Sequence, residues 1–399
     1  MAEQDRTYDP PRWRLTRWLA DPGKNVPDDL RIALTARLFG TLPVFAAGVI
    51  NTLVVSAVSA GRLQTISFII WAVLEFAVCA ARLTVLVTAR RAALEHRRTW
   101  TDLHVLLALC WTGTVGYGVF ISLLCGDWVV ATLSCLSAAA MVGGVCFRNF
   151  SAPRMATAMI LFSLGPLLLG ATMAGQPLLY LVFLQGPLYV IAMSMAAFKL
   201  NSMLIATLSA ERLSEHRATH DALTGLLNRA GLAGTFERSR ADSGTRLALL
   251  FIDLDDFKRV NDTHGHLVGD RLLQGLAARL MDVLPDDSVA ARIGGDEFVV
   301  LLRSVCAEDT AIVCERLVEA LSASYDVEGA GAVRVGLSIG MAVAESAAVS
   351  LDDLLARSDK ELYAAKLARK TDGELLDSAI RELREITARI PQAGLARAS

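Results

Sequence analysis

The sequence predicts a bundle of six α-helical membrane spans followed by an α+β domain, with a ferredoxin-like or palm-like antiparallel sheet covered by helices. The first half of the 399 residues holds six long apolar runs joined by short loops. Beyond residue 220, short β-branched runs alternate with amphipathic helical patterns, which is typical of helices packed on a sheet. Composition agrees, because only 20% of the residues are charged, against about 25% in a soluble domain.

The six apolar runs are each close to the ~20 residues that a spanning helix needs. They cover residues 38–60, 65–89, 103–125, 128–148, 155–175 and 178–199. Arginine and lysine gather in the N-terminal segment, after the second and fourth runs, and after the sixth, whereas the alternate loops hold only Arg62. Because positively charged loops stay in the cytoplasm, we expect both termini and the α+β domain there.

Three polar residues interrupt the apolar runs. Glu75 and Arg82 stand seven residues apart in the second run, so they share one helical face. Charges inside a membrane are costly and often functional, and both an ion pair between these two residues and a sensing role stay open. His104 stands at the edge of the third run without a second His or Cys at ligand spacing. We therefore expect it on the surface rather than on a haem or a metal.

The chain is expected to divide into a cytoplasmic N-terminal segment (1–37), the spans (38–199), a helical connector (200–219), the α+β domain (220–372) and a C-terminal tail (373–399). No proline follows Pro187 before residue 219, so the sixth span is expected to continue as one helix through the connector. An apolar stripe of Ile205, Leu208 and Leu213 leaves open whether this helix pairs with a second copy or is a spacer.

Within the α+β domain, strand and helix patterns alternate. The expected elements are a strand at 247–254, a helix at 269–284, a hairpin of 289–293 and 298–302, a helix at 311–324, a strand at 333–344 and a helix at 351–368. Ser350 followed by Asp353 forms a capping box at the start of the last helix.

The charge of the chain is divided between its halves. Residues 1–220 carry 18 Lys and Arg against 12 Asp and Glu, whereas residues 221–372 carry 17 against 25. An acidic domain is poorly suited to nucleic acid, which proteins bind by displacing counterions from phosphates, so no nucleic-acid partner is expected. It is well suited to a divalent cation. The seven cysteines show no zinc or disulfide spacing.

Two groups of carboxylates lie where apolar strands end. The stretch 253–256 reads DLDD, and the hairpin turn at 294–297 reads GGDE. Acids that converge at strand ends need a cation, and oxygen ligands select hard ions such as Mg²⁺, which prefers a few carboxylates plus substrate phosphates. The glycines leave the backbone open to a phosphate, while Lys258 and Lys366 add positive charge. These residues predict metal-assisted nucleotidyl or phosphoryl transfer.

The same stretches resemble the GGDEF-type diguanylate cyclases of bacteria. The resemblance covers about 219–372 and is carried, in order, by DALTGLLNR at 221–229, FIDLDDFK at 251–258, NDTHGH at 261–266, GD at 269–270, RIGGDEF at 292–298, LSIG at 337–340 and DKELYAAK at 359–366. It implies that two GTP molecules are joined into cyclic di-GMP with release of two pyrophosphates. It also implies a homodimer in which each subunit holds one GTP, and a place in the bacterial inner (cell) membrane.

Two alternatives stay open beside an active cyclase. One is a catalytically idle receptor that binds GTP or cyclic di-GMP and signals through partners. The other is a transporter carrying an appended cyclase. What argues against a transporter is that no span is broken by paired Gly and Pro in a repeat-like pattern.

The resemblance also assigns roles to residues. It gives Mg²⁺, or Mn²⁺ in its place, to Asp253, the backbone carbonyl of Leu254, and Asp296. It makes Asp296 the proton acceptor, with Glu297 supporting the metal and the geometry. The substrate contacts that it implies are guanine on Asn261 and Asp270, the sugar or a nearby phosphate on His266, and the β- and γ-phosphates on the amides of Asp256 and Phe257 with Lys258 and Lys366, beside Gly294 and Gly295.

Two positions depart from the family pattern. Arg369-Lys370-Thr371 stands where the family usually shows Gly-Arg-Asn. Lys370 can supply charge to a phosphate but lacks the bidentate fork of arginine. The stretch 285–288 reads PDDS where the family's product-inhibition site begins with an arginine, so we expect little inhibition through that site.

Overall fold

The computed structural model describes residues 8–24, 26–40, 42–240, 246–303, 307–345 and 349–372. The chain divides into two compact units, Met1–Ser209 and Ala210–Ser399, and each is described by itself. The expected tail at 373–399 lies outside the described residues.

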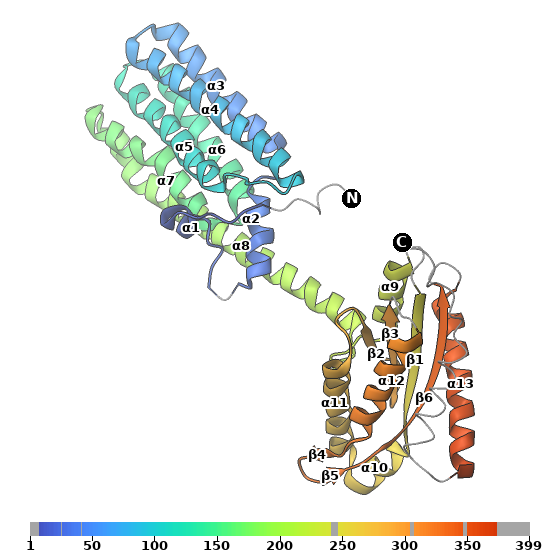
Figure 1. The fold of residues 1–399 in the computed structure, drawn as a ribbon. Coiled ribbons are helices and arrows are strands. Elements are labelled where there is room, and N and C mark those ends of the chain that lie inside the picture. The colour runs from blue at the N-terminus through green and yellow to red at the C-terminus, as the bar shows by residue number, and fades with distance from the viewer. Residues whose placement is uncertain are drawn as a thin grey trace, which may run out of the picture. The chain divides into compact units, whose positions relative to one another are not determined.

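The first unit is a bundle of long helices (Figure 1). Its helices are α1 (Arg14–Ala20), α2 (Asp28–Arg37), α3 (Leu42–Leu63), α4 (Ile66–Leu94), α5 (Thr101–Leu124), α6 (Trp128–Asn149), α7 (Pro153–Met173), the 3₁₀ turn η1 (Pro177–Leu181) and α8 (Val182–Thr219). Among the described residues, six segments are long and apolar enough to cross a membrane, α3 to α7 and the continuous stretch Pro177–Thr219. This confirms six helices of spanning length at the six predicted apolar runs.

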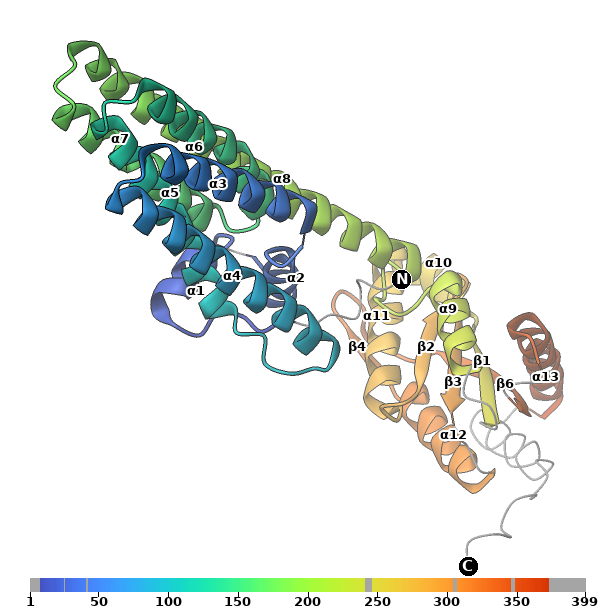
Figure 2. The ribbon, with the colours of Figure 1, turned by 90° about the horizontal axis from the view of Figure 1, so that it is seen from above.

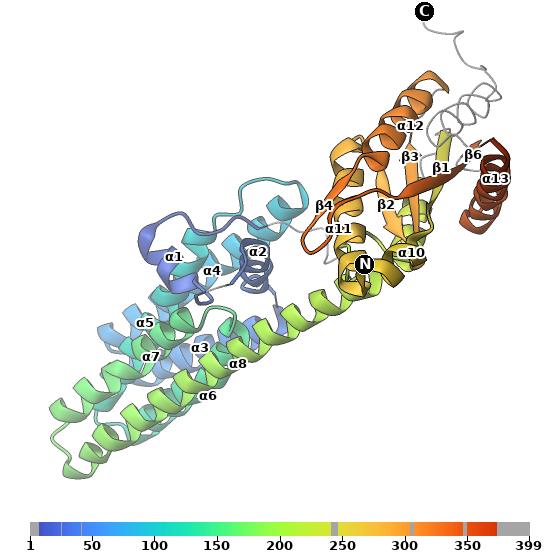
Figure 3. The ribbon, with the colours of Figure 1, turned by 90° about the horizontal axis from the view of Figure 1, so that it is seen from below.

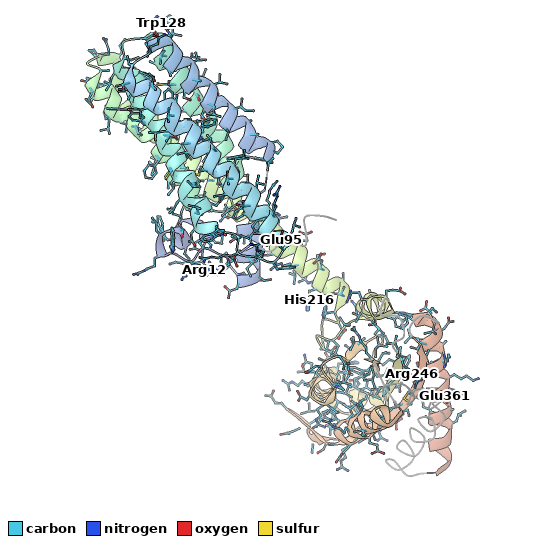
Figure 4. All side chains as sticks on the ribbon, turned by 45° about the horizontal axis from the view of Figure 1, so that its top comes forward. Arg12, Glu95, Trp128, His216, Arg246 and Glu361 are labelled. Carbon is cyan, nitrogen blue, oxygen red and sulfur yellow. The ribbon has the colours of Figure 1, made fainter. Side chains whose placement is uncertain are left out.

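Short connections make consecutive spans run in opposite directions. Figure 4 shows Trp128 at one end of the bundle and Arg12 and Glu95 at the other. At the Trp128 end, Asp127 caps α6 by accepting from two backbone amides and pairs with Arg62 at 2.6 Å. The arginine-rich connections therefore share the end of the bundle opposite Trp128.

The charged residues Glu75 and Arg82 inside the bundle are buried, and they do not form the direct ion pair that was one of the two alternatives. Glu75 accepts hydrogen bonds from Trp111 Nε1 at 2.8 Å and Thr114 Oγ1 at 2.6 Å. The guanidinium of Arg82 lies 4.3 Å from the centre of the Trp111 ring and 5.0 Å from that of Phe45. Trp111 therefore contacts both groups, donating to the acid and offering its ring face to the cation.

The expectation that His104 lies on the surface is wrong. Its side chain is 2% exposed, and its ring centroid lies 4.5 Å from that of Phe39. The cause is the N-terminal segment, which lies against the start of α5: Tyr8 stacks on Phe39, and Asp102 accepts from the amide of Arg12 at 3.0 Å. The long sequence separation of these partners hides the contact from any local pattern.

The prediction that the sixth span continues through the connector is confirmed, because α8 runs without interruption from Val182 to Thr219. Part of its apolar stripe is covered within the first unit. Leu30 and Leu34 of α2 pack with Leu204 and Leu208 of α8. Nearby, Asn201 Nδ2 donates to the carbonyl of Pro22 at 2.7 Å.

The second unit is built on an antiparallel sheet with strand order β2-β3-β1-β6. Its strands are β1 (Arg246–Asp255), β2 (Val289–Arg292), β3 (Glu297–Arg303) and β6 (Gly336–Glu345), and a small hairpin pairs β4 (Tyr325–Val327) with β5 (Gly331–Val333). Its helices are α9 (Arg229–Arg240), α10 (Phe257–His264), α11 (His266–Val283), α12 (Ala307–Ser322) and α13 (Leu351–Asp372). The expected strand at 333–344 is thus divided between β5 and β6, and α9, α10 and β4 were not predicted.

Helices cover both faces of the sheet, as Figure 2 and Figure 3 show. Strand residues alternate between two cores, with Leu250 and Ile252 facing α11 and α12, and Leu249 and Phe251 facing α9 and α13. This alternation follows from the period of two in a strand. The predicted antiparallel sheet covered by helices is confirmed.

Candidate functional site

Strand pairing brings the predicted acids to one end of the sheet. In the antiparallel register of β1 and β3, Asp253 lies opposite Glu297, the first residue of β3. The amide of Leu254 donates to the carbonyl of Asp296 at 3.3 Å. Leu254 itself is 1% exposed, so its side chain anchors the end of β1 while its neighbours are partly exposed.

A lysine from α13 reaches this end of the sheet. Lys366 Nζ lies 2.7 Å from Asp253 Oδ1. The position of the helix depends on Gly340 of β6, because a Cβ there would lie 2.1 Å from the carbonyl oxygen of Ser358. Only glycine allows α13 to pack this close to the sheet, and the close packing sets the lysine beside the acid.

The carboxylates carry more negative charge than the single lysine balances. Burial raises the pKa of Asp253, the charges of Asp296 and Asp359 raise it further, and Lys366 opposes the shift. Burial also raises the pKa of Glu297, and the charges of Asp253, Asp296 and Asp359 add to the effect. Such a group gains from a cation. Asp359 was not assigned from the sequence, although its spacing of seven residues from Lys366 places both on one face of α13.

The donor set fits a hard cation that shares its shell with substrate. In the described part of the chain, no three His, Cys, Asp or Glu side chains gather closely enough to hold a metal alone. Mg²⁺ commonly takes one or two carboxylates and completes its shell with water and phosphate oxygens. Asp253, the carbonyl of Leu254 and Asp296 would supply such a partial shell.

The two glycines of the turn differ in what surrounds them. A Cβ on Gly294 would lie 2.2 Å from Glu297 Oε2, so the carboxylate of Glu297 occupies the space beside it. A Cβ on Gly295 would have no neighbour within 4 Å. Gly294 therefore makes room for an acid of the chain itself, whereas Gly295 leaves the backbone open to the outside.

Arg292 fixes the turn from behind. Its Nη2 donates to the carbonyl of Gly295 at 2.7 Å, and its Nη1 lies 3.0 Å from Asp221 Oδ1. Burial opposes ionisation of Asp221, but hydrogen bonds from Thr224 and Arg292 outweigh it and hold the pKa of Asp221 below its usual value. Both residues lie within the quoted motifs, but the contact between Arg292 and Asp221 was not predicted.

The segment after β1 presents a helix N-terminus close to the acids. Asp256 has φ 55°, a left-handed conformation that turns the chain directly from β1 into α10. The amides at the start of a helix favour anions. Asp256 and Lys258 are exposed, while Phe257 is buried and anchors the turn.

A buried side-chain amide oxygen lies where α10 meets α11. A Cβ on Gly269 would lie 1.9 Å from Asn261 Oδ1, so the carboxamide lies against the bare backbone of α11. Asn261 Oδ1 is buried without a hydrogen-bond partner. His266, the first residue of α11, and Asp270, at the start of its second turn, are exposed. Lys370 belongs to α13, but its side chain lies outside the described part of the structure.

Comparison with known proteins identifies the second unit. The family profile described as "Diguanylate cyclase, GGDEF domain" matches residues 218–372. These residues are a GGDEF domain. The acids, glycines and lysine described above all lie within it.

Curated relatives and solved structures are similar to part of this chain. Diguanylate cyclase TpbB of Pseudomonas aeruginosa is 35% identical over 186 residues, which are 45% of this chain and 43% of that protein. An uncharacterized signaling protein of Caulobacter vibrioides is 41% identical over 165 residues, 40% of this chain and 20% of that protein. A solved structure comprising only the GGDEF domain of TpbB is 35% identical, with a TM-score of 0.36, and covers 37% of this chain and 89% of that one. The chain thus spans less than half the length of the curated relatives.

Proposed function

We propose that this protein is a membrane-anchored diguanylate cyclase that condenses two GTP molecules into cyclic di-GMP and two pyrophosphates. The observation that carries the proposal is the end of β1, where Asp253, Asp296 and Glu297 repel one another electrostatically. Among the described residues, Lys366 is the one cation paired with them. This excess negative charge suits Mg²⁺, or Mn²⁺, together with a triphosphate. The bound ion would polarise the phosphates and neutralise their charge.

The chain's own residues would bind and orient the nucleotide. Gly295 leaves space for the α-phosphate, and the amides at the start of α10 with Lys258 would hold the outer phosphates. The unpaired Oδ1 of Asn261 would accept a hydrogen from guanine, with Asp270 on the same base.

In each of two steps, the 3′-oxygen of one GTP forms a bond to the α-phosphorus of the other. The bond to pyrophosphate breaks, and the hydroxyl proton passes to Asp296. Lys366 would stabilise the phosphates, with Lys370 and His266 at the edge of the site. Because each subunit supplies one GTP, the reaction requires a homodimer.

The apolar helices would hold the domain at the inner (cell) membrane. We propose that both termini are cytoplasmic, because the arginine-rich connections share the end of the bundle from which α8 leaves. The membrane region would then regulate the enzyme by biasing how two GGDEF domains meet.

The test is a product assay on the full-length protein in lipid nanodiscs with GTP and Mg²⁺. Wild type should form cyclic di-GMP, and Asp296→Asn should abolish it. Asp326→Asn is the matched control, because it removes the same charge from an exposed position on β4. If the wild-type dimer binds GTP without turnover, the idle receptor is favoured instead. If it neither binds GTP nor converts it, the proposal is refuted.

A further inference from the structure

A cavity with a basic lining lies in the first unit, at the end of the bundle that carries the arginine-rich connections. It has a volume of about 510 Å³, and its wall is formed by the end of α2, the last turns of α4 and α6, and Tyr8. Arg37, Arg90 and Arg148 line it, and no acid among the described residues does. We call it the arginine cavity.

Two donor atoms in the wall are buried without partners, although Arg148 Nη2 donates to the carbonyl of Leu38 at 3.4 Å. Arg148 is 6% exposed and Ser151 is 3% exposed. Arg148 Nε and Ser151 Oγ have no hydrogen-bond partner in the structure. A buried donor without a partner costs roughly 1–3 kcal/mol, so both atoms remain able to donate to an acceptor.

The charges point to an anionic acceptor. Arg90 donates through Nε to the carbonyl of Phe39 at 3.0 Å and through Nη2 to that of Gly40 at 3.2 Å. Arg148 packs its guanidinium 4.7 Å from the centre of the Phe45 ring. None of the three arginines forms an ion pair with a carboxylate within the described ranges. In the part of the chain that the structure describes, no carboxylate pairs with these like charges.

The rim of the cavity is apolar. Phe147 lines it and is 58% exposed on α6, a helix long and apolar enough to span the membrane. A phospholipid entering from the bilayer would place its acyl chains against Phe147 and its phosphate beside the arginines. A phosphate from solution would use the arginines alone.

We propose that the arginine cavity binds the phosphate of an anionic phospholipid headgroup. Arg148 Nε and Ser151 Oγ donate to phosphate oxygens, and Arg37 and Arg90 neutralise the charge. Basic pockets between membrane helices at the cytoplasmic surface suit such headgroups. The site is separate from the GGDEF domain, so its test does not depend on the proposed cyclase activity.

The experiment titrates short-chain phosphatidylglycerol into the full-length protein in neutral detergent and counts bound lipid by native mass spectrometry. Phosphatidylcholine with the same acyl chains and inorganic phosphate are titrated in parallel. Arg37→Gln should weaken phosphatidylglycerol binding about fivefold, since a surface arginine contributes about 1 kcal/mol to such binding. Arg91→Gln, an exposed neighbour outside the cavity, should leave it unchanged.

Ser151→Ala provides a second readout. It removes a buried hydroxyl that has no partner in the lipid-free structure, so the variant should fold and melt at least as well as wild type. Binding should still fall about tenfold, because a hydrogen bond to a charged group is lost.

Three results would overturn the proposal. If phosphatidylcholine binds as tightly as phosphatidylglycerol, the anionic headgroup has no role. If Arg91→Gln weakens binding as much as Arg37→Gln, general surface charge rather than the cavity explains the binding. Equal binding by inorganic phosphate, with no gain from acyl chains, would replace the lipid by a phosphate from solution.

Discussion

Replacing Gly340 by alanine should loosen α13 and break the ion pair between Lys366 and Asp253. A Cβ at this position would lie 2.1 Å from the carbonyl oxygen of Ser358 and 2.2 Å from the amide nitrogen of Leu362. Non-bonded carbon atoms rest about 3.5–4.0 Å apart, and neither main-chain atom can rotate away. Strand and helix must therefore separate by about 1 Å or more.

That separation sets the size of the effect. Overpacking a core costs about 1–3 kcal/mol, and a clash with two backbone atoms belongs at the upper end. For a domain of this length, 3 kcal/mol lowers the melting temperature by roughly 6–12 °C. The Lys366–Asp253 distance of 2.7 Å would rise beyond the ~3.2 Å limit of a good hydrogen bond, so GTP turnover should fall as well.

The assay is thermal unfolding of the full-length protein, with hydrogen exchange followed in peptides from α13 and β6. Gly234→Ala on α9 is the control, because the nearest atom to its Cβ is the end of the Arg238 side chain at 3.7 Å. Alanine should stabilise that helix by about 0.5–1 kcal/mol. If Gly340→Ala melts like wild type and α13 exchanges no faster, the packing argument is refuted.

Further predictions concern the turn, the Asp221 carboxylate and a buried thiol. Gly294→Ala should displace the Glu297 carboxylate and lower the rate of cyclic di-GMP formation, whereas Gly295→Ala should leave the fold intact and mainly raise the KM for GTP; equal kinetics for the two would contradict this. Because the pKa of Asp221 is lowered in the folded state, its stabilisation is complete above the unfolded value of ~3.9 and is lost as the pH falls through the folded value. In urea unfolding, Asp221→Asn should therefore lower the free energy of unfolding by about 1–2 kcal/mol at pH 7 and by progressively less below pH ~4. A loss that does not change with pH would show that ionisation of Asp221 is not involved. Burial raises the pKa of Cys314 to about 12, so peptide mass spectrometry should find it unmodified by iodoacetamide at pH 8 until the protein is denatured.

The features predicted correctly from the sequence are those that short, local stretches of the chain determine. Apolar runs of spanning length determine the six long helices, and the alternation around 247–254 determines a strand with two buried faces. The acids at 253–256 and 294–297 could be placed together because a hairpin and its neighbouring strand bring strand ends to one edge. The roles assigned to these residues stay predictions.

The features that escaped prediction depend on partners far apart in the chain. His104 is buried because Phe39 and the N-terminal segment cover it. Arg292 pairs with Asp221, 71 residues away in the chain, and no local sequence pattern predicts this ion pair. Glu75 also finds its hydrogen-bond donors on another helix, so the spacing along α4 suggested the wrong partner.

The packing of α2 on α8 limits how two copies of this chain can associate. Leu204 and Leu208, which a partner helix would need for a continuous seam, are already engaged by Leu30 and Leu34. A coiled coil between two protomers would therefore have to start beyond Leu208 or displace α2 from α8. If two copies paired through α8, removing α2 would free about two more turns of that helix for the contact.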